Sequence, residues 1–263
     1  MRRVIAISNQ KGGVGKTTTA INVAVALAQS GASVLLIDLD PQGNATSGLA
    51  KDAADRKNAA PQATIYDALI DRKSISEVLK QVRDNLMLAP ASSDLVGAEI
   101  ELATAEGREQ KLTALLASEQ QYNYVLIDSP PSLGLLTLNA LVAADTVLIP
   151  LQCEYYALEG LSALLGTIRR VKAALNSRLE VEGIVLTMFD SRNRLSRDIE
   201  REVRVHFPDR VFSAVIPRSV RLSESPSHGL SIFEYDPRSA GALAYRRLAA
   251  EVAGRREPMV AVS

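Results

Sequence analysis

Short apolar runs alternate along the chain with longer stretches in which apolar residues recur at helical spacing. The runs that we predict to form strands are residues 4–8, 33–38, 86–89, 124–128, 146–151, 181–188 and 211–216. Several are continuously apolar, as expected for strands buried on both faces of a sheet. The helical stretches include residues 16–30, 95–105, 157–175, 196–206 and 241–252. This alternation predicts an α/β fold of three layers, with a mostly parallel twisted sheet flanked by helices on both faces.

The composition is that of an ordinary globular protein, with 47% hydrophobic and 23% charged residues in a chain of 263. We expect one domain over residues 1–254, a mobile surface loop at 51–61 and a flexible tail at 255–263. The single cysteine, Cys153, excludes a disulfide within the chain and a cysteine-based metal site. No apolar run approaches the roughly 18–20 residues of a membrane-spanning helix.

The net charge is zero but unevenly distributed. Residues 1–159 carry 13 Lys and Arg against 18 Asp and Glu, whereas residues 160–263 carry 17 against 12. A basic half can indicate a polyanionic partner. Composition alone, however, favours ordinary surface charge, because an excess of five cations over about a hundred residues is common.

A glycine-rich segment, QKGGVGKTT at residues 10–18, lies between the first predicted strand and the first predicted helix. The usual phosphate-loop pattern needs a glycine five residues before Gly15, but Gln10 stands there, and Lys11 adds a second lysine. Glycines let backbone N–H groups approach phosphate oxygens, and the helix N-terminus attracts the anion. We therefore predict that Lys16 contacts the β- and γ-phosphates and that the Thr17 hydroxyl contacts Mg²⁺. A tight turn without a ligand is the less favoured alternative.

Three carboxylates follow predicted strands. Asp38 and Asp40 come at the end of the second run, and Asp128 ends the run at residues 124–128. In a parallel sheet the ligand crevice lies at the carboxyl ends of the strands, so all three can approach one phosphate group. Each aspartate alone could be a turn or cap residue, but three beside a phosphate loop favour a nucleotide and Mg²⁺ site.

Several segments resemble one family of ATPases. Residues 11–18, KGGVGKTT, resemble the deviant phosphate loop of the ParA/MinD group, and residues 38–44 and 128–134 resemble its two switches. Residues 154–160, 187–192, 216–227 and 235–238 resemble the chromosome-partitioning branch, the ParA/Soj proteins. The similarity extends over nearly the whole chain, from residue 4 to about residue 252.

The resemblance implies roles for individual residues. Lys11 would cross the interface of an ATP-dependent homodimer and contact the partner's phosphates, which places Lys11, Lys16 and Asp40 in catalysis. Asp40 would position the attacking water, and the metal site would comprise Thr17, Asp40 and Asp128. For Gln42 and Asn44, sensing of the γ-phosphate and simple turn chemistry remain equally open. The implied nucleotide contacts are Lys11, Gly12, Gly13, Val14, Gly15, Lys16, Thr17, Thr18, Met188, Pro217 and Arg218.

Arginines of the second half match the DNA-contacting positions of the family. Arg192 and Arg221 carry the match, and Arg218 and Arg238 are further candidates. Contacts to phosphates alone would make the binding of double-stranded DNA non-specific and salt-sensitive. A single arginine could instead form a surface ion pair, and Arg218, which follows Pro217 at a strand end, could line the adenine pocket.

We therefore expect a cytoplasmic, nucleoid-associated DNA-partitioning ATPase that uses ATP and Mg²⁺. A ParB-type centromere-binding partner would stimulate hydrolysis, and the predicted helices at 95–105 and 157–175 are candidates for its docking surface. MinD-like relatives end in a basic amphipathic helix that lies on the membrane. No stable membrane association is expected here, because Gly254 and Pro258 would interrupt such a helix in this chain. The alternatives are a ParA-like positioning ATPase for a non-DNA cargo without a ParB partner, and a metabolic ligase, for which we see no acceptor motif.

Overall fold

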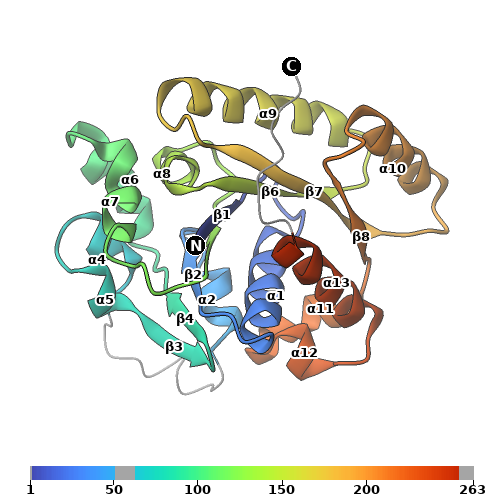
Figure 1. The fold of residues 1–263 in the computed structure, drawn as a ribbon, viewed down its shortest axis with the longest axis horizontal. Helices are drawn as coiled ribbons and strands as arrows, with labels where there is room; N and C mark the ends of the chain where they lie inside the picture. The colour runs from blue at the N-terminus through green and yellow to red at the C-terminus, as the bar shows by residue number, and fades with distance from the viewer. Residues whose placement is uncertain (1, 51–62, 255–263) are drawn as a thin grey trace.

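A twisted sheet organises the residues that the computed structural model describes, 2–50 and 63–254 (Figure 1). In that part of the chain the sheet has eight strands in the order β3-β4-β2-β5-β1-β6-β7-β8. All neighbours pair in parallel except β3, which runs antiparallel to β4 at the edge. The strands are β1 (Arg3–Ile7), β2 (Val34–Asp38), β3 (Lys80–Arg83), β4 (Leu86–Ala89), β5 (Tyr124–Asp128), β6 (Thr146–Gln152), β7 (Glu180–Phe189) and β8 (Val211–Pro217).

Helices cover both faces of this sheet, so the predicted three-layer architecture is confirmed (Figure 1). One face packs against α1 (Lys16–Gln29), α11 (Val220–Glu224), α12 (Ile232–Tyr235) and α13 (Ala240–Gly254). The other packs against α4 (Ile65–Leu69), α5 (Ile75–Val78), α6 (Leu95–Glu101), α7 (Lys111–Leu116), α8 (Leu135–Ala143), α9 (Ala157–Ala174) and α10 (Arg194–His206). Successive side chains of a strand point to opposite faces, and in β2 Leu35 and Ile37 enter one core while Val34 and Leu36 enter the other.

Every apolar run predicted as a strand forms one, with ends shifted by no more than one residue. The prediction missed β3, because its sequence, KQVR, is polar and lies at the sheet edge. The predicted helix at 95–105 is divided into α6 and a 3₁₀ turn, η1 (Leu102–Thr104). The loop predicted at 51–61 and the tail predicted at 255–263 lie outside the described residues.

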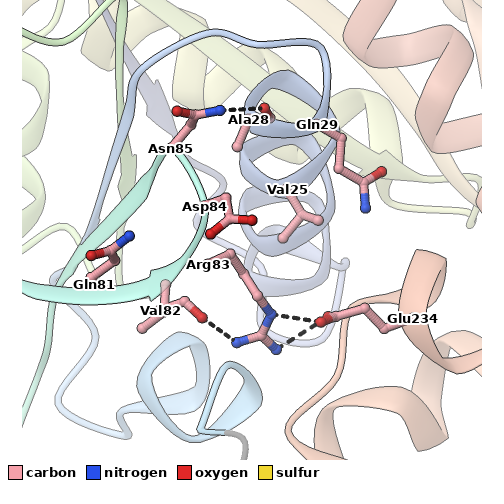
Figure 2. A pocket seen from close by; sticks show the side chains of 9 residues that line it. All are labelled: Val25, Ala28, Gln29, Gln81, Val82, Arg83, Asp84, Asn85 and Glu234. Atoms are coloured by element: carbon pink, nitrogen blue, oxygen red, sulfur yellow. Dashed lines mark hydrogen bonds and ion pairs between the residues drawn. The ribbon is translucent and has the colours of Figure 1, made fainter.

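Arg83 ties the edge strand β3 to α12, which packs on one face of the sheet. Figure 2 shows its guanidinium paired with Glu234 of α12, at 2.6 and 3.1 Å, beside a cavity of about 630 Å³. The carbonyls of Leu49, Val82 and Gly229 accept its remaining hydrogen bonds. This cavity adjoins the last turns of α1, at Val25, Ala28 and Gln29, and therefore lies at the far end of that helix from the glycine-rich loop.

The register of the central strands brings the predicted site together. Ile7, Asp38 and Asp128 are neighbours across β1, β5 and β2, at the carboxyl ends of these strands. The glycine-rich loop follows β1 and lies at the same carboxyl ends. The sheet alone therefore positions both strand-end carboxylates beside the loop.

The contact between α1 and α13 gives a test of the fold around this loop. Tyr245 of α13 and Thr19 of α1 are buried, and their hydroxyl oxygens are 3.2 Å apart. Burial raises the pKa of the Tyr245 phenol, so it stays protonated. Tyr245→Phe leaves the Thr19 hydroxyl unsatisfied and should lower the free energy of unfolding by about 1–3 kcal/mol in urea titrations. Tyr155→Phe, at a side chain that is 77% exposed, is the control and should leave it unchanged.

Candidate nucleotide-binding site

The glycine-rich loop connects β1 to α1 and is anchored by a residue that the motif does not include. Gly13 and Gly15 have φ angles of 73° and 87°, which favour glycine, and Gly15 is the N-cap of α1. Asn9 is buried; its Nδ2 donates to the Pro150 carbonyl at 2.7 Å, and its Oδ1 accepts from the Lys11 N–H at 3.0 Å. Sequence reasoning missed Asn9, although a polar residue directly after a buried strand was a usable signal.

The other end of the loop is fixed by β7. Thr187 is buried and its hydroxyl donates to the Val14 carbonyl at 2.8 Å. Next to it lies a cavity of about 100 Å³ at the end of β7 and β8, where Met188 has a φ of 49°, unusual for a residue other than glycine. The cavity is lined by Gly15, Thr18, Thr187, Met188, Ile216, Pro217, Arg218, Ser219, Leu222, Ser223 and Tyr245. The structure thus brings Met188, Pro217 and Arg218 to the loop, where we predicted nucleotide contacts.

Lys16 lies inside the site rather than at its surface. Its side chain is largely buried, and its Nζ donates to the Lys11 carbonyl at 3.0 Å. Burial lowers the pKa of Lys16, and the negative charges of Asp128 and Asp40 oppose that shift. An ammonium in such surroundings interacts strongly with any anion that enters the loop.

Asp128 is a fully buried carboxylate whose two oxygens accept no hydrogen bond of normal geometry from the described residues. Burial raises its pKa well above the ordinary value, and the neighbouring Asp38 raises it further. The nearby Thr17 hydroxyl and Lys16 ammonium lower it in part, yet neither Asp128 oxygen has a hydrogen bond of normal geometry. A buried carboxylate left in this way fits a cation site. Thr17 and Asp128 together could hold Mg²⁺, which typically takes one or two protein oxygens plus waters and phosphate oxygens.

The other two aspartates are tied to the loop after β2. Asp38 is fully buried and accepts hydrogen bonds from the backbone N–H and hydroxyl of Thr46, at 2.8 and 2.7 Å. Burial raises the pKa of Asp38 to about 6 despite these bonds. Asp40 is 7% exposed, and its Oδ1 accepts from the Gln42 N–H at 3.0 Å. Asp38 therefore holds the start of α2 (Asn44–Gly48), while Asp40 lies close enough to Lys16 to influence its pKa.

Gln42, in the loop before α2, and Asn44, at the start of α2, are both exposed. Only the backbone N–H of Gln42 contacts Asp40, and Asn44 is the first residue of α2. Both the turn role and the γ-phosphate role predicted for these side chains remain open.

Lys11 lies at the rim of the loop, with a side chain that is 44% exposed. Its ammonium pairs with Glu154, which follows β6, and the other Glu154 oxygen accepts from the Gln152 amide. Beside this pair Tyr155 and Tyr156 are 77% and 67% exposed, with their rings stacked edge to face. The second lysine of the loop is thus held by its own chain, on a surface that also presents two aromatic rings.

The four predicted DNA-contacting arginines lie on different segments, Arg192 after β7, Arg218 after β8, Arg221 in α11 and Arg238 between α12 and α13, and they differ in their partners. Arg192 pairs with Asp190 at 2.9 Å, and Arg221 with Glu224 and Asp236 at 3.3 and 3.7 Å. For Arg218 and Arg238 no ion pair is formed within residues 2–50 and 63–254. Arg192 and Arg221 therefore form surface ion pairs, which was the alternative to DNA contact for these arginines.

This fold and loop define a phosphate-loop nucleotide-binding protein, and comparison with known proteins assigns the family. Residues 2–181 match the model of a family described as an AAA domain. The chain is 54% identical to the sporulation initiation inhibitor protein Soj of Bacillus subtilis, covering 96% of this chain and 99% of that protein. It is 51% identical to the chromosome partitioning protein ParA of Caulobacter vibrioides, covering 96% and 94%.

A solved relative shows the same fold with ligands bound. It is a cobyrinic acid a,c-diamide synthase from Mycobacterium smegmatis, with bound ATP analogue and magnesium. Its TM-score is 0.84 at 37% identity, covering 97% of this chain and 95% of that one. On the sequence matches, the chain belongs to the ParA/Soj family of chromosome-partitioning ATPases, as the motifs predicted. No helix among the described residues is long and apolar enough to cross a membrane.

The orphaned Asp128 gives a test of the site. Its pKa is raised in the folded chain, so its ionisation costs stability as the pH rises from about 4 through that raised value. At pH 8 without nucleotide, Asp128→Asn should therefore raise the melting temperature by about 2–4 °C, equivalent to roughly 1 kcal/mol. It should also abolish the further rise produced by ATP with Mg²⁺. The gain should disappear near pH 4, and a lower melting temperature at pH 8 would contradict our assignment.

Proposed function

We propose that this chain is an ATP-dependent DNA-partitioning protein. Two copies, each with ATP and Mg²⁺, form a dimer that binds double-stranded DNA without sequence preference. A ParB-type centromere-binding partner stimulates hydrolysis and releases the DNA, which moves or positions replicated origins. The observation that carries this proposal is the pair of lysines in one loop: Lys16 is buried inside the site, whereas Lys11 is at its rim, where a second copy can meet it.

The roles of the residues inside the site follow from their positions. Lys16 neutralises phosphate charge from within, and the loop N–H groups and the N-terminus of α1 hold the phosphate oxygens. Thr17 and Asp128 hold Mg²⁺, which supplies positive charge to the transferred phosphoryl group. Asp40, almost buried and fixed by the Gln42 N–H, positions the attacking water. Asp40 orients the water and does not act as a strong base, so slow turnover without a partner is expected.

Lys11 connects the site to a second copy. Burying phosphates between two chains requires additional cations, because the desolvation of the charge is otherwise prohibitive. Lys11 must exchange Glu154 for a phosphate to serve in this way, and both side chains are 44% exposed, so their pairing is weak. The adjacent Tyr155 and Tyr156 are the kind of exposed aromatic residues that become buried in protein interfaces.

Two other functions are weighed against this proposal. A positioning ATPase for a non-DNA cargo would share the site and the dimer but would need no DNA-facing arginines. The synthase name of the solved relative suggests a metabolic enzyme, yet that relative is 37% identical, against 54% and 51% for the partitioning proteins. Both alternatives predict that ATP does not control DNA binding.

The first test compares DNA binding in three nucleotide states. Purified protein should bind arbitrary duplex DNA tightly with ATP and weakly with ADP or without nucleotide, as measured by fluorescence anisotropy. With ATP, the slope of log affinity against log salt should be about −0.9 for each phosphate contacted. Equal affinity in all three states would rule out the proposed switch.

The second test separates Lys11 from the residues that act within one chain. Lys11→Ala should bind ATP as a monomer with little loss but form no ATP-dependent dimer, as measured by light scattering. Asp40→Ala is the matched comparison and should form the dimer while losing turnover. Lys16→Ala should lose nucleotide binding altogether. Normal dimerisation of Lys11→Ala with ATP would show that this lysine does not complete a neighbour's site.

A further inference from the structure

The ion pair between Arg192 and Asp190 is the closest of those made by the predicted DNA-contacting arginines. Arg192 Nε donates to one carboxylate oxygen of Asp190 and a terminal nitrogen donates to the other, both at 2.9 Å. Such a bidentate pairing is the strong form of an arginine–carboxylate contact. The contacts of Arg221 with Glu224 and Asp236 are longer, at 3.3 and 3.7 Å.

The two members of the pair differ in mobility. Asp190 directly follows β7, and its Oδ1 also accepts from the backbone N–H of Arg192 at 3.0 Å, which fixes the carboxylate to its own turn. The side chain of Asp190 is 27% exposed, whereas that of Arg192 is 89% exposed. Arg192 can therefore leave the pair by rotating its side chain, but Asp190 stays in place.

The carboxylate is charged under all conditions of interest. Hydrogen bonds from Arg192 lower the pKa of Asp190 to about 2, and the charges of Arg192 and Arg218 contribute to the same shift. A fixed negative charge thus lies within the group of arginines that should face DNA. It occupies two of the donor groups of Arg192 and offsets the charge of that side chain.

We propose that Asp190 competes with DNA phosphates for Arg192 and thereby lowers the affinity of this chain for DNA. This inference rests on the proposed function, because it concerns the same DNA-binding surface. A phosphate that approaches Arg192 must either displace the carboxylate or share the guanidinium with it. Sharing places two anions near each other, and displacement leaves the Asp190 carboxylate with a hydrogen bond from the backbone N–H of Arg192.

An orienting role for Asp190 predicts the opposite sign. If the carboxylate mainly held the guanidinium in a useful direction, its removal would weaken DNA binding by freeing a long side chain. We favour competition because non-specific DNA binding is dominated by charge, and because Arg192 is too exposed to be held firmly by one surface pair.

The test uses Asp190→Asn in a double-mutant cycle with Arg192→Ala, in the full chain with ATP, ADP or no nucleotide. Asp209→Asn is the matched control, because it makes the same charge change at an exposed residue between α10 and β8 that forms no ion pair within the described ranges. Affinity for a fluorescent duplex of random sequence is measured by anisotropy. With ATP, Asp190→Asn should bind about two- to fivefold more tightly than the wild type, and Asp209→Asn should gain clearly less. In the Arg192→Ala background the gain from Asp190→Asn should shrink to that of the control.

The outcomes distinguish this inference from the proposed function. If the wild type binds DNA with ATP, but Asp190→Asn gains no more than Asp209→Asn or binds more weakly, the competition is overturned and the proposed function stands. An equal gain with and without Arg192 also overturns it, because the effect would then be one of net charge. If the wild type binds no DNA in any nucleotide state, both are overturned.

Discussion

Burial of charged groups at the carboxyl ends of the central strands is the constraint on which the rest of this molecule depends. Asp38, Asp128 and Lys16 lie at the carboxyl ends of the central strands and are almost inaccessible to water. Burial raises the pKa of both carboxyls and lowers that of the ammonium, so each group is held in surroundings that disfavour its charge. Asp38 accepts two hydrogen bonds from Thr46, whereas the oxygens of Asp128 accept no hydrogen bond of normal geometry from the described residues. A cation with an anionic ligand would satisfy both Lys16 and Asp128, so we expect these groups to cost stability in the free chain and to gain it on binding.

Each of the two lysines of the loop contacts an acceptor of its own chain, and the two contacts differ in their exposure to water. Lys16 donates to a backbone carbonyl inside the site, and Lys11 pairs with Glu154 in partial contact with water. The carbonyl that accepts this hydrogen bond from Lys16 is that of Lys11 itself. Movement of the Lys16 ammonium toward a phosphate therefore removes a bond that holds the backbone of Lys11. In the proposed dimer, nucleotide binding in one site would therefore change the freedom of Lys11, the residue proposed to reach the other copy.

Local patterns predicted most of the fold, but the long-range contacts of the site were not predictable from them. Apolar runs identified all the parallel strands among the described residues, because burial of a strand leaves little choice of side chain. The sequence did not predict the polar strand β3, because a strand at the edge of a sheet can pair without an apolar pattern. The loop and its strand-end carboxylates were predicted from residue types at short spacing. Asn9 with Pro150, Thr187 with Val14 and Lys11 with Glu154 join positions more than a hundred residues apart, and they depend on the order of the strands.

The cavity beside the glycine-rich loop and two of the predicted DNA-contacting arginines, Arg192 and Arg218, lie within a few residues of each other at the ends of β7 and β8. Met188 lines the cavity, the Phe189 carbonyl accepts from the Arg218 N–H at 3.0 Å, and Asp190 holds Arg192. Arg218 lines the cavity, and its charge also acts on Asp190. The sequence left open whether Arg218 serves adenine or DNA, and its position is compatible with both interpretations. A change at Arg218 alters both sites at once, whereas Asp190 is not among the residues that line the cavity. Asp190 is therefore the residue through which the charge facing DNA can be changed while the nucleotide cavity keeps its lining.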